Sequence, residues 1–159
     1  MKLPDKICKV IGSADENGLL GGMILFPDNE KLNELLRYGY GRFETAVPFA
    51  ITAFGDILTW EDEKYLVKVS FVDGKTTVLS RGCDYFFEDI EDPSYASRYF
   101  DIEALNAAKE KCGDLSEDEC YSYVPLPALG GDKRIEHVEK AKFFEYLTIA
   151  IQANGKIEC

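Results

Sequence analysis

Residues 48–60 read PFAITAFGDILTW, two apolar segments on either side of Gly55-Asp56. A Gly-X pair between two such segments is typical of a tight hairpin turn, because glycine readily adopts the positive φ that these turns require. The stretch therefore predicts two antiparallel strands that pair through a short turn.

The segment after this hairpin continues the strand pattern. Residues 65–71 (YLVKVSF) place four side chains on one face: Tyr65, Val67, Val69 and Phe71. Lys68 and Ser70 fall on the opposite face, which predicts a sheet with one buried face and one partly polar face. Asp73-Gly74 then turns the chain into a fourth strand, TTVLS at residues 76–80. Four consecutive strands with short turns predict an antiparallel meander.

Helical patterns lie on both sides of these strands. Apolar residues recur every three or four positions, and a glycine follows, in three segments: residues 29–38, 102–112 and 143–154. Ser116–Glu119 has the form of a capping box and predicts a short helical turn. Strands in the middle of the chain with helices around them predict an α+β fold, with a central antiparallel meander sheet flanked by helices and a helical C-terminal half.

Composition and length predict a single domain over residues 1–159, with residues 1–17 as a short N-terminal segment. The net charge of −11 argues against binding nucleic acid through its phosphates, which requires clustered lysine and arginine. The start, MKLPDKICKVIG, has charges where a signal peptide would be apolar, and nowhere are about 18 apolar residues consecutive. We therefore expect a cytoplasmic protein that does not enter a membrane.

No residue pattern predicts catalysis. Five cysteines without a C-x-x-C pair indicate reduced thiols, not a disulfide framework or a zinc site. His137, the only histidine, lies in a charged stretch (135–142) that we expect to be a helical surface, and Cys120 is expected to be a small core residue. An enzyme would need one of these two side chains in a pocket. The prediction is no catalytic residue, no cofactor and no metal.

Residues 123–131 (YVPLPALGG) raise a separate question about anion binding. Gly130-Gly131, followed by Lys133 and Arg134 and by an expected helix, would suit a small-molecule or nucleotide-binding regulatory module. The spacing, however, matches neither a P-loop nor a dinucleotide fingerprint. The favoured interpretation is a connector, because the two prolines impose an extended path and the two glycines allow a sharp reversal.

An acidic and aromatic segment is the candidate binding surface. Residues 84–103 contain seven acidic side chains and one basic side chain, Arg98, interleaved with tyrosine and phenylalanine. Such a surface would hold a basic protein, because complementary charge speeds encounter and tyrosines provide buried contact area. The candidate partner-binding residues are Asp84, Tyr85, Glu88, Asp89, Glu91, Asp92 and Tyr95. The alternative is that the aromatic residues belong to the core and the carboxylates form a solvated face.

Three stretches carry a family resemblance: VPFAITAFGDILTWED, SRGCDYFFEDIED, and YFDIEALNAAKEKCGDLSEDECYSYVPLPALGG followed by a final apolar helix. Over roughly residues 18–159 the chain resembles the GAD-like, type VI secretion immunity family of bacteria, which is similar in style to the SUKH immunity superfamily. The resemblance implies an α+β domain and no catalytic motif. It also implies a role beside a secreted toxin, DNases being among the toxins that such proteins bind.

Together these observations predict a cytoplasmic immunity protein that binds and neutralises a cognate, basic toxin without catalysis. No nucleic acid and no membrane are expected as partners. The regulatory module built on the Gly130-Gly131 turn is the alternative from another functional class.

Overall fold

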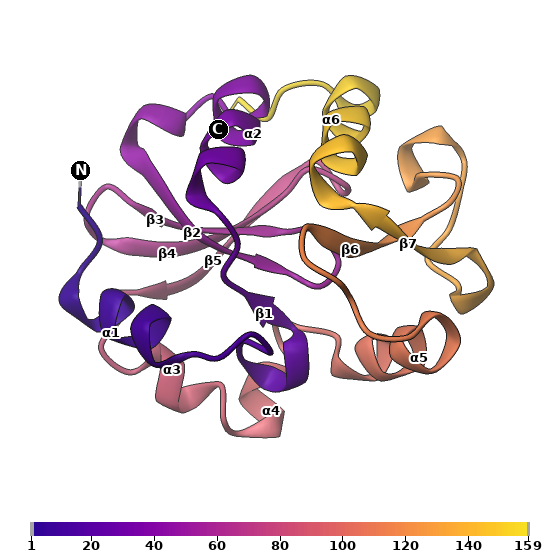
Figure 1. Cartoon of the computed structure of the whole chain (residues 1–159). Coiled ribbons are helices and arrows are strands. Elements are labelled where there is room, and N and C mark those ends of the chain that lie inside the picture. The colour runs from indigo at the N-terminus through magenta and orange to yellow at the C-terminus, as the bar shows by residue number, and fades with distance from the viewer. Residues whose placement is uncertain (1, 159) are drawn as a thin grey trace.

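The computed structural model describes residues 2–158 and has a five-stranded antiparallel sheet at its centre (Figure 1). The strands lie in sequence order: β1 (Ile24–Leu25), β2 (Ala46–Thr52), β3 (Ile57–Glu61), β4 (Tyr65–Ser70) and β5 (Lys75–Arg81). Helices surround the sheet, so the predicted α+β fold with a central meander is confirmed.

The predicted hairpin is formed by β2 and β3, but its turn covers residues 53–55, because Asp56 already pairs with Thr52. The prediction of Gly55-Asp56 as a two-residue turn is therefore wrong. Ile51 pairs with Ile57, and the turn between them closes with the Thr52 amide donating to the Asp56 carbonyl at 2.7 Å. Gly55 has a φ of 93°, the left-handed conformation for which a glycine is needed. The Asp56 amide also donates to the Thr52 hydroxyl at 3.0 Å, so both backbone groups of Asp56 are fixed by one residue.

The edge strand β1 was not predicted from the sequence. It comes from the apolar run at residues 23–26, where Ile24 pairs with Thr52 and Leu25 with Ile51. The Ala53 amide donates to the Met23 carbonyl at 2.8 Å and extends this contact past the strand end. Two residues of strand are too few for a period-2 pattern to be recognised in the sequence.

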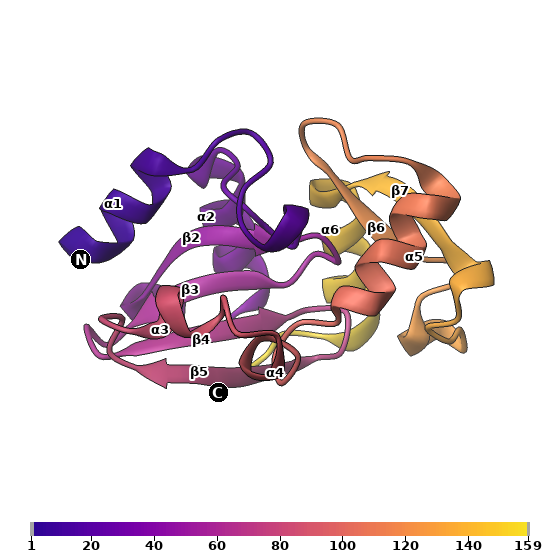
Figure 2. The ribbon, with the colours of Figure 1, turned by 90° about the horizontal axis from the view of Figure 1, so that it is seen from below.

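Helices cover both faces of the sheet (Figures 1 and 2). One face is covered by α2 (Asn29–Gly39) and α6 (Phe143–Asn154), and the other by α1 (Asp5–Ser13), α3 (Phe86–Asp89) and α4 (Pro93–Ala96). Every residue of β3 is buried. The face of β4 that carries Lys68 and Ser70 is partly polar, as predicted, although Leu66 and Ser70 on it are buried and Lys68 is only partly exposed.

The three predicted helices are present, and two of them have an aspartate as N-cap. Asp28 accepts a hydrogen bond from the Glu30 amide at 3.0 Å at the start of α2. Asp101 accepts one from the Ala104 amide at 2.9 Å at the start of α5 (Ile102–Cys112). A carboxylate at the N-cap satisfies an amide that has no partner inside the helix.

The C-terminal half also contains a hairpin that the sequence did not predict. Strands β6 (Glu119–Tyr123) and β7 (Val138–Lys142) pair antiparallel, so the helical turn expected after residue 116 and the helix expected over 135–142 are both wrong. Only one half of the capping box forms, with the Ser116 amide donating to Glu119 at 2.6 Å. Two short 3₁₀ turns, Pro127–Leu129 and Ile135–His137, lie between these strands.

Long-range contacts explain why this segment is a hairpin. The Tyr121 amide donates to the Ala53 carbonyl at 2.7 Å, which joins β6 to the β2–β3 turn. The Lys111 ammonium of α5 donates to the carbonyls of Ile135, Glu136 and Val138 at 2.9–3.0 Å. These contacts satisfy backbone groups that a helix over this segment would have satisfied locally.

Gly39 allows α2 and α6 to approach each other over the sheet. A Cβ atom at this position would lie 2.6 Å from Cδ1 of Ile151 and 2.8 Å from Cε1 of Phe71. Both neighbours are buried, so neither side chain can move away without disturbing the core.

Gly39→Ala should therefore destabilise the protein by about 1–3 kcal/mol, because the added methyl group overpacks this contact. The matched control is Gly12→Ala in α1, where no heavy atom lies within 4 Å of the added Cβ. The control should be neutral or stabilising by up to about 1 kcal/mol, because alanine favours the helix. Urea unfolding of both variants measures these differences, and equal stabilities would contradict the packing account.

Candidate functional site

The acidic segment includes α3 and α4, which cover one face of the sheet (Figure 2). Its apolar side chains point inward and are buried: Phe86, Phe87, Ile90, Ala96 and Phe100. The Phe87 ring meets the ring of Phe49 on β2 at 6.4 Å in an edge-to-face arrangement. Because these side chains are needed to cover the sheet, the polar side chains between them face solvent.

Six of the seven predicted binding residues are exposed: Asp84, Tyr85, Glu88, Asp89, Glu91 and Asp92. We call these six residues the acidic surface. The Tyr85 side chain is 75% exposed, so it is free to act as an aromatic anchor. All three phenylalanines of residues 84–103 are in the core and the carboxylates are outside, which is the arrangement that the alternative interpretation expected.

Tyr95, the seventh predicted residue, has a packed environment. Its ring contacts the rings of Phe86 at 6.4 Å and Tyr99 at 5.7 Å, and the Arg98 guanidinium lies over it at 5.7 Å. Burial raises the pKa of its hydroxyl group. Tyr95 is therefore only partly exposed, and its ring packs beside the acidic surface.

Two carboxylates of the acidic surface have partners within the chain. Lys6 of α1 forms an ion pair with Glu88, and this hydrogen bond holds the pKa of the Glu88 carboxyl below its usual range. Asp92 accepts a hydrogen bond from the Ser94 amide at 2.9 Å and caps α4. Among residues 2–158, no ion pair involves Asp84, Asp89 or Glu91, which leaves three carboxylates for a partner.

Lys6 was not predicted as a neighbour of this surface. It is 82 positions away from Glu88 in the sequence, and no local spacing connects the two residues. The ion pair is exposed, so its effect on stability is small, but it places one positive charge beside the acidic surface.

The Gly130-Gly131 turn does not offer its amides to an anion. The Gly130 amide donates to the Pro127 carbonyl at 3.1 Å, and the Gly131 amide donates to the Leu126 carbonyl at 3.0 Å. The expected helix after the turn is absent, so no helix dipole supports an anion there. Lys133 is paired with Asp73 at 2.8 Å. The connector interpretation accounts for each of these contacts.

Cys120 and His137 do not form a nucleophile and base pair. Cys120 is 1% exposed, and burial raises the pKa of its thiol to about 12. A thiol with this pKa is not a thiolate at neutral pH and is a poor nucleophile. His137 has its Nδ1 atom 2.7 Å from the Asp132 carboxylate, and among the described residues no hydrogen bond joins it to Cys120.

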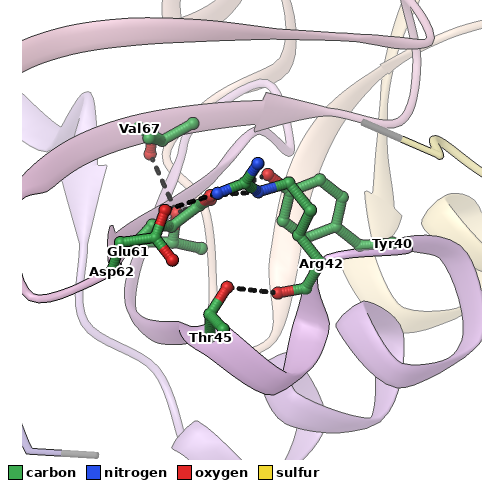
Figure 3. A network of polar contacts seen from close by, with 7 residues as sticks. Tyr40, Arg42, Thr45, Glu61, Asp62 and Val67 are labelled. Atoms are coloured by element: carbon green, nitrogen blue, oxygen red, sulfur yellow. Dashed lines mark hydrogen bonds and ion pairs between the residues drawn. The ribbon is translucent and has the colours of Figure 1, made fainter.

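A buried carboxylate, Glu61 of β3, lies on the face of the sheet that α2 covers (Figure 3). The Tyr40 hydroxyl donates to both of its oxygens at 2.9 Å, and the Thr59 hydroxyl donates to one at 2.6 Å. Arg42 approaches at 3.6 Å and also pairs with Asp62. Because side chains of the same chain pair with the buried Glu61 carboxylate, this group of residues is a structural link between α2 and the sheet.

Comparison with known families supports a functional assignment. Residues 80–154 match the family described as T6SS immunity protein Tdi1, C-terminal. This match confirms the resemblance to type VI secretion immunity proteins that the sequence motifs indicated. The matched segment begins near the end of β5 and includes α3, α4, the β6–β7 hairpin and α6, so the whole acidic surface lies within it.

Among solved structures, the fold is similar to the crystal structure of Atu4351 from Agrobacterium tumefaciens. The TM-score is 0.65 at 17% sequence identity, over 98% of this chain and 82% of that one. At this identity the likeness concerns the fold alone. No match is found among curated proteins.

Within residues 2–158, none of the helices has the length and hydrophobicity of a membrane span. The same residues contain no group of three or more histidine, cysteine or acidic side chains with the arrangement of a metal site.

The burial of Cys120 predicts its reactivity. In native protein at pH 8, iodoacetamide should modify the exposed Cys8 much faster than Cys120, because the Cys120 thiol stays protonated and inaccessible. Mass spectrometry of the separate peptides measures how much of each cysteine is labelled. Labelling in guanidinium is the control in which both cysteines react. Equal native rates would show that Cys120 is open to solvent and would return it to the catalytic candidates.

Proposed function

We propose that this protein is a cytoplasmic type VI secretion immunity protein that binds a cognate toxin and neutralises it without catalysis. The observation that carries the proposal is the match of residues 80–154 to a type VI immunity family. That segment contains the acidic surface, so the proposed binding residues are in the part of the chain that resembles immunity proteins.

The contact we propose is between the acidic surface and a basic face of the toxin. Asp84, Asp89 and Glu91 are exposed and unpaired within the described chain, and Tyr85 beside them provides aromatic contact area. Carboxylates close together on one surface raise the rate of encounter with a positively charged partner. A nuclease is one such partner, because the basic site that receives phosphate would be covered by this surface.

Neutralisation would be stoichiometric under this proposal. One immunity protein covers one toxin, so protection depends on their ratio and on the lifetime of the complex. Co-expression with the product of the adjacent gene tests this directly, through rescue of growth and co-purification of the two proteins. If the chain co-purifies with no toxin and rescues no growth, the immunity proposal fails.

Reversal of charge on the acidic surface should weaken toxin binding. The triple variant Glu88→Lys, Asp89→Lys and Glu91→Lys should slow association by about 10-fold or more at low salt, because electrostatic steering is lost. The difference should shrink at about 0.5 M salt, where exposed charges are screened. Surface plasmon resonance with immobilised toxin measures both rates.

The control is an equal reversal on the other side of the molecule. Glu34, Glu145 and Glu158 are exposed and belong to α2, α6 and the residues after α6. Their replacement by lysine changes the net charge by the same amount but leaves the acidic surface intact. If both triple variants slow association equally, the net charge alone is responsible and the acidic surface is not the contact.

A further inference from the structure

A groove runs between the segment before β1 and the connection from α5 to β6. It consists of two hollows, with volumes of about 480 Å³ and 340 Å³. Both hollows are lined by Glu16, Asn17, Leu25 and Leu115, so they adjoin at these four residues. Each volume lies within the range of about 300–1,000 Å³ that is typical of binding sites.

The base of this groove is apolar. Leu25 and Phe26 on one wall and Leu115 on the other are packed against the core but stay partly exposed. The other apolar side chains of the lining are buried members of the core: Ile51, Leu105, Tyr121 and Phe143. An apolar side chain that enters either hollow would therefore remove apolar surface from water on both partners.

Hydrogen bonds within the chain hold both walls of the groove. On the first wall, the backbones of Leu19 and Ile24 exchange hydrogen bonds of 2.8 Å and 3.1 Å. On the second wall, the Ser116 amide donates to the Glu119 carboxylate at 2.6 Å, and the Glu119 amide donates to the Ser116 carbonyl at 3.2 Å. The groove is thus formed before a partner binds, which lowers the cost of ordering on binding.

Carboxylates outnumber cations in the lining of the groove. The acidic residues that line it are Glu16, Asp114, Glu117, Asp118 and Glu119. One basic residue lines it, Lys109, and its ammonium already donates to the Gly21 carbonyl. Three of the carboxylates, on Glu16, Asp114 and Glu117, are exposed, and among residues 2–158 no ion pair involves them. We call these three the rim carboxylates.

The other lysines near this rim are held by groups of the chain. Lys31 pairs with Asp118 at 2.9 Å. Lys140 and Lys142 donate to backbone carbonyls of the second wall at 3.3 Å and 3.5 Å, and their side chains do not line the groove. The rim carboxylates are therefore left to interact with positive charges of a partner that lies over the apolar base.

We propose that this groove receives a segment of the toxin that carries apolar side chains next to lysine or arginine. The apolar side chains enter the two hollows, and the basic side chains meet the rim carboxylates. Two adjoining hollows suit successive apolar side chains of one chain segment better than a single compact molecule. The proposal rests on the proposed function, because the toxin supplies the segment, and it adds apolar burial to the electrostatic contact of the acidic surface.

Crosslinking identifies what occupies the groove. p-Benzoylphenylalanine in place of the exposed Glu117 should crosslink to the toxin when the complex is irradiated. Mass spectrometry of the joined peptides should find a toxin segment with apolar residues beside lysine or arginine. The same amino acid in place of Glu158, which does not line the groove, is the control and should give no toxin crosslink.

Three crosslinking results would overturn the inference. One is a crosslink from position 117 only to a second copy of this chain. Another is a crosslink to an acidic or entirely polar segment of the toxin. The third is the absence of any toxin crosslink from position 117 in a stable complex, which is also the result expected if a small molecule occupies the groove.

Loss of the apolar contact should shorten the lifetime of the complex. Leu115→Ser should speed dissociation by about 10-fold or more, because Leu115 lines both hollows and interface contacts act mainly on dissociation. Leu129→Ser is the matched control, because Leu129 is 62% exposed and does not line the groove. Surface plasmon resonance with immobilised toxin measures both rates, and equal dissociation rates of the two variants would contradict the inference.

A second variant leaves the apolar base intact, so it tests the groove even if Leu115→Ser lowers stability. Glu16→Lys with Glu117→Lys changes two exposed side chains and should also speed dissociation, because basic side chains of the toxin then meet like charges. Glu136→Lys with Glu158→Lys, also exposed and outside the groove, makes the same change in net charge and is the control. Equal effects of the two pairs would overturn the role of the rim carboxylates.

These measurements separate the possible failures. If the wild-type chain binds the toxin, but position 117 gives no toxin crosslink and the groove variants dissociate like their controls, the inference is overturned while the immunity function remains. If the wild-type chain binds no toxin, the proposed function itself fails, and the inference fails with it.

Discussion

The burial of both faces of the central hairpin is the constraint on which the rest of the structure depends. All residues of β3 and nearly all of β2 are buried, so apolar cover is required above and below these strands. On one face, α2 and α6 provide this cover, and they lie close together because Gly39 has no side chain. The hydrogen bond between Tyr40 and Glu61 links the end of α2 to the sheet. On the other face, shorter and less regular elements provide the apolar cover.

This division explains where the proposed function lies. The segment with α3 and α4 covers the sheet with Phe86, Phe87 and Ile90, and the carboxylates between these residues are left on the outside. The acidic surface is therefore the solvent-facing side of the segment that covers the sheet. Under the proposed function, the acidic surface would speed the encounter with a positively charged toxin.

Local patterns in the sequence predicted the parts of the fold that depend on local contacts. The β2–β3 hairpin, the meander, and the helices at residues 29–38 and 102–112 follow from the spacing of apolar residues and from the glycines at turns and helix ends. The β6–β7 hairpin depends on Tyr121 bonding to Ala53 and on Lys111 bonding to three distant carbonyls, and neither contact leaves a periodic signal. In the site, exposure of the carboxylates was predictable from alternating apolar residues. The ion pair of Glu88 with Lys6, the packing of Tyr95 and the groove beside Leu25 and Leu115 required the tertiary structure.

The central claim is that the α3–α4 side of the molecule contacts the toxin. Hydrogen–deuterium exchange of the purified complex with the cognate toxin tests it most directly, because short surface helices exchange rapidly in the free protein and have much protection to gain. New protection is expected over residues 84–101, with little change over α2 and α6. Protection confined to α2 and α6, with residues 84–101 unchanged in a stable complex, would contradict it.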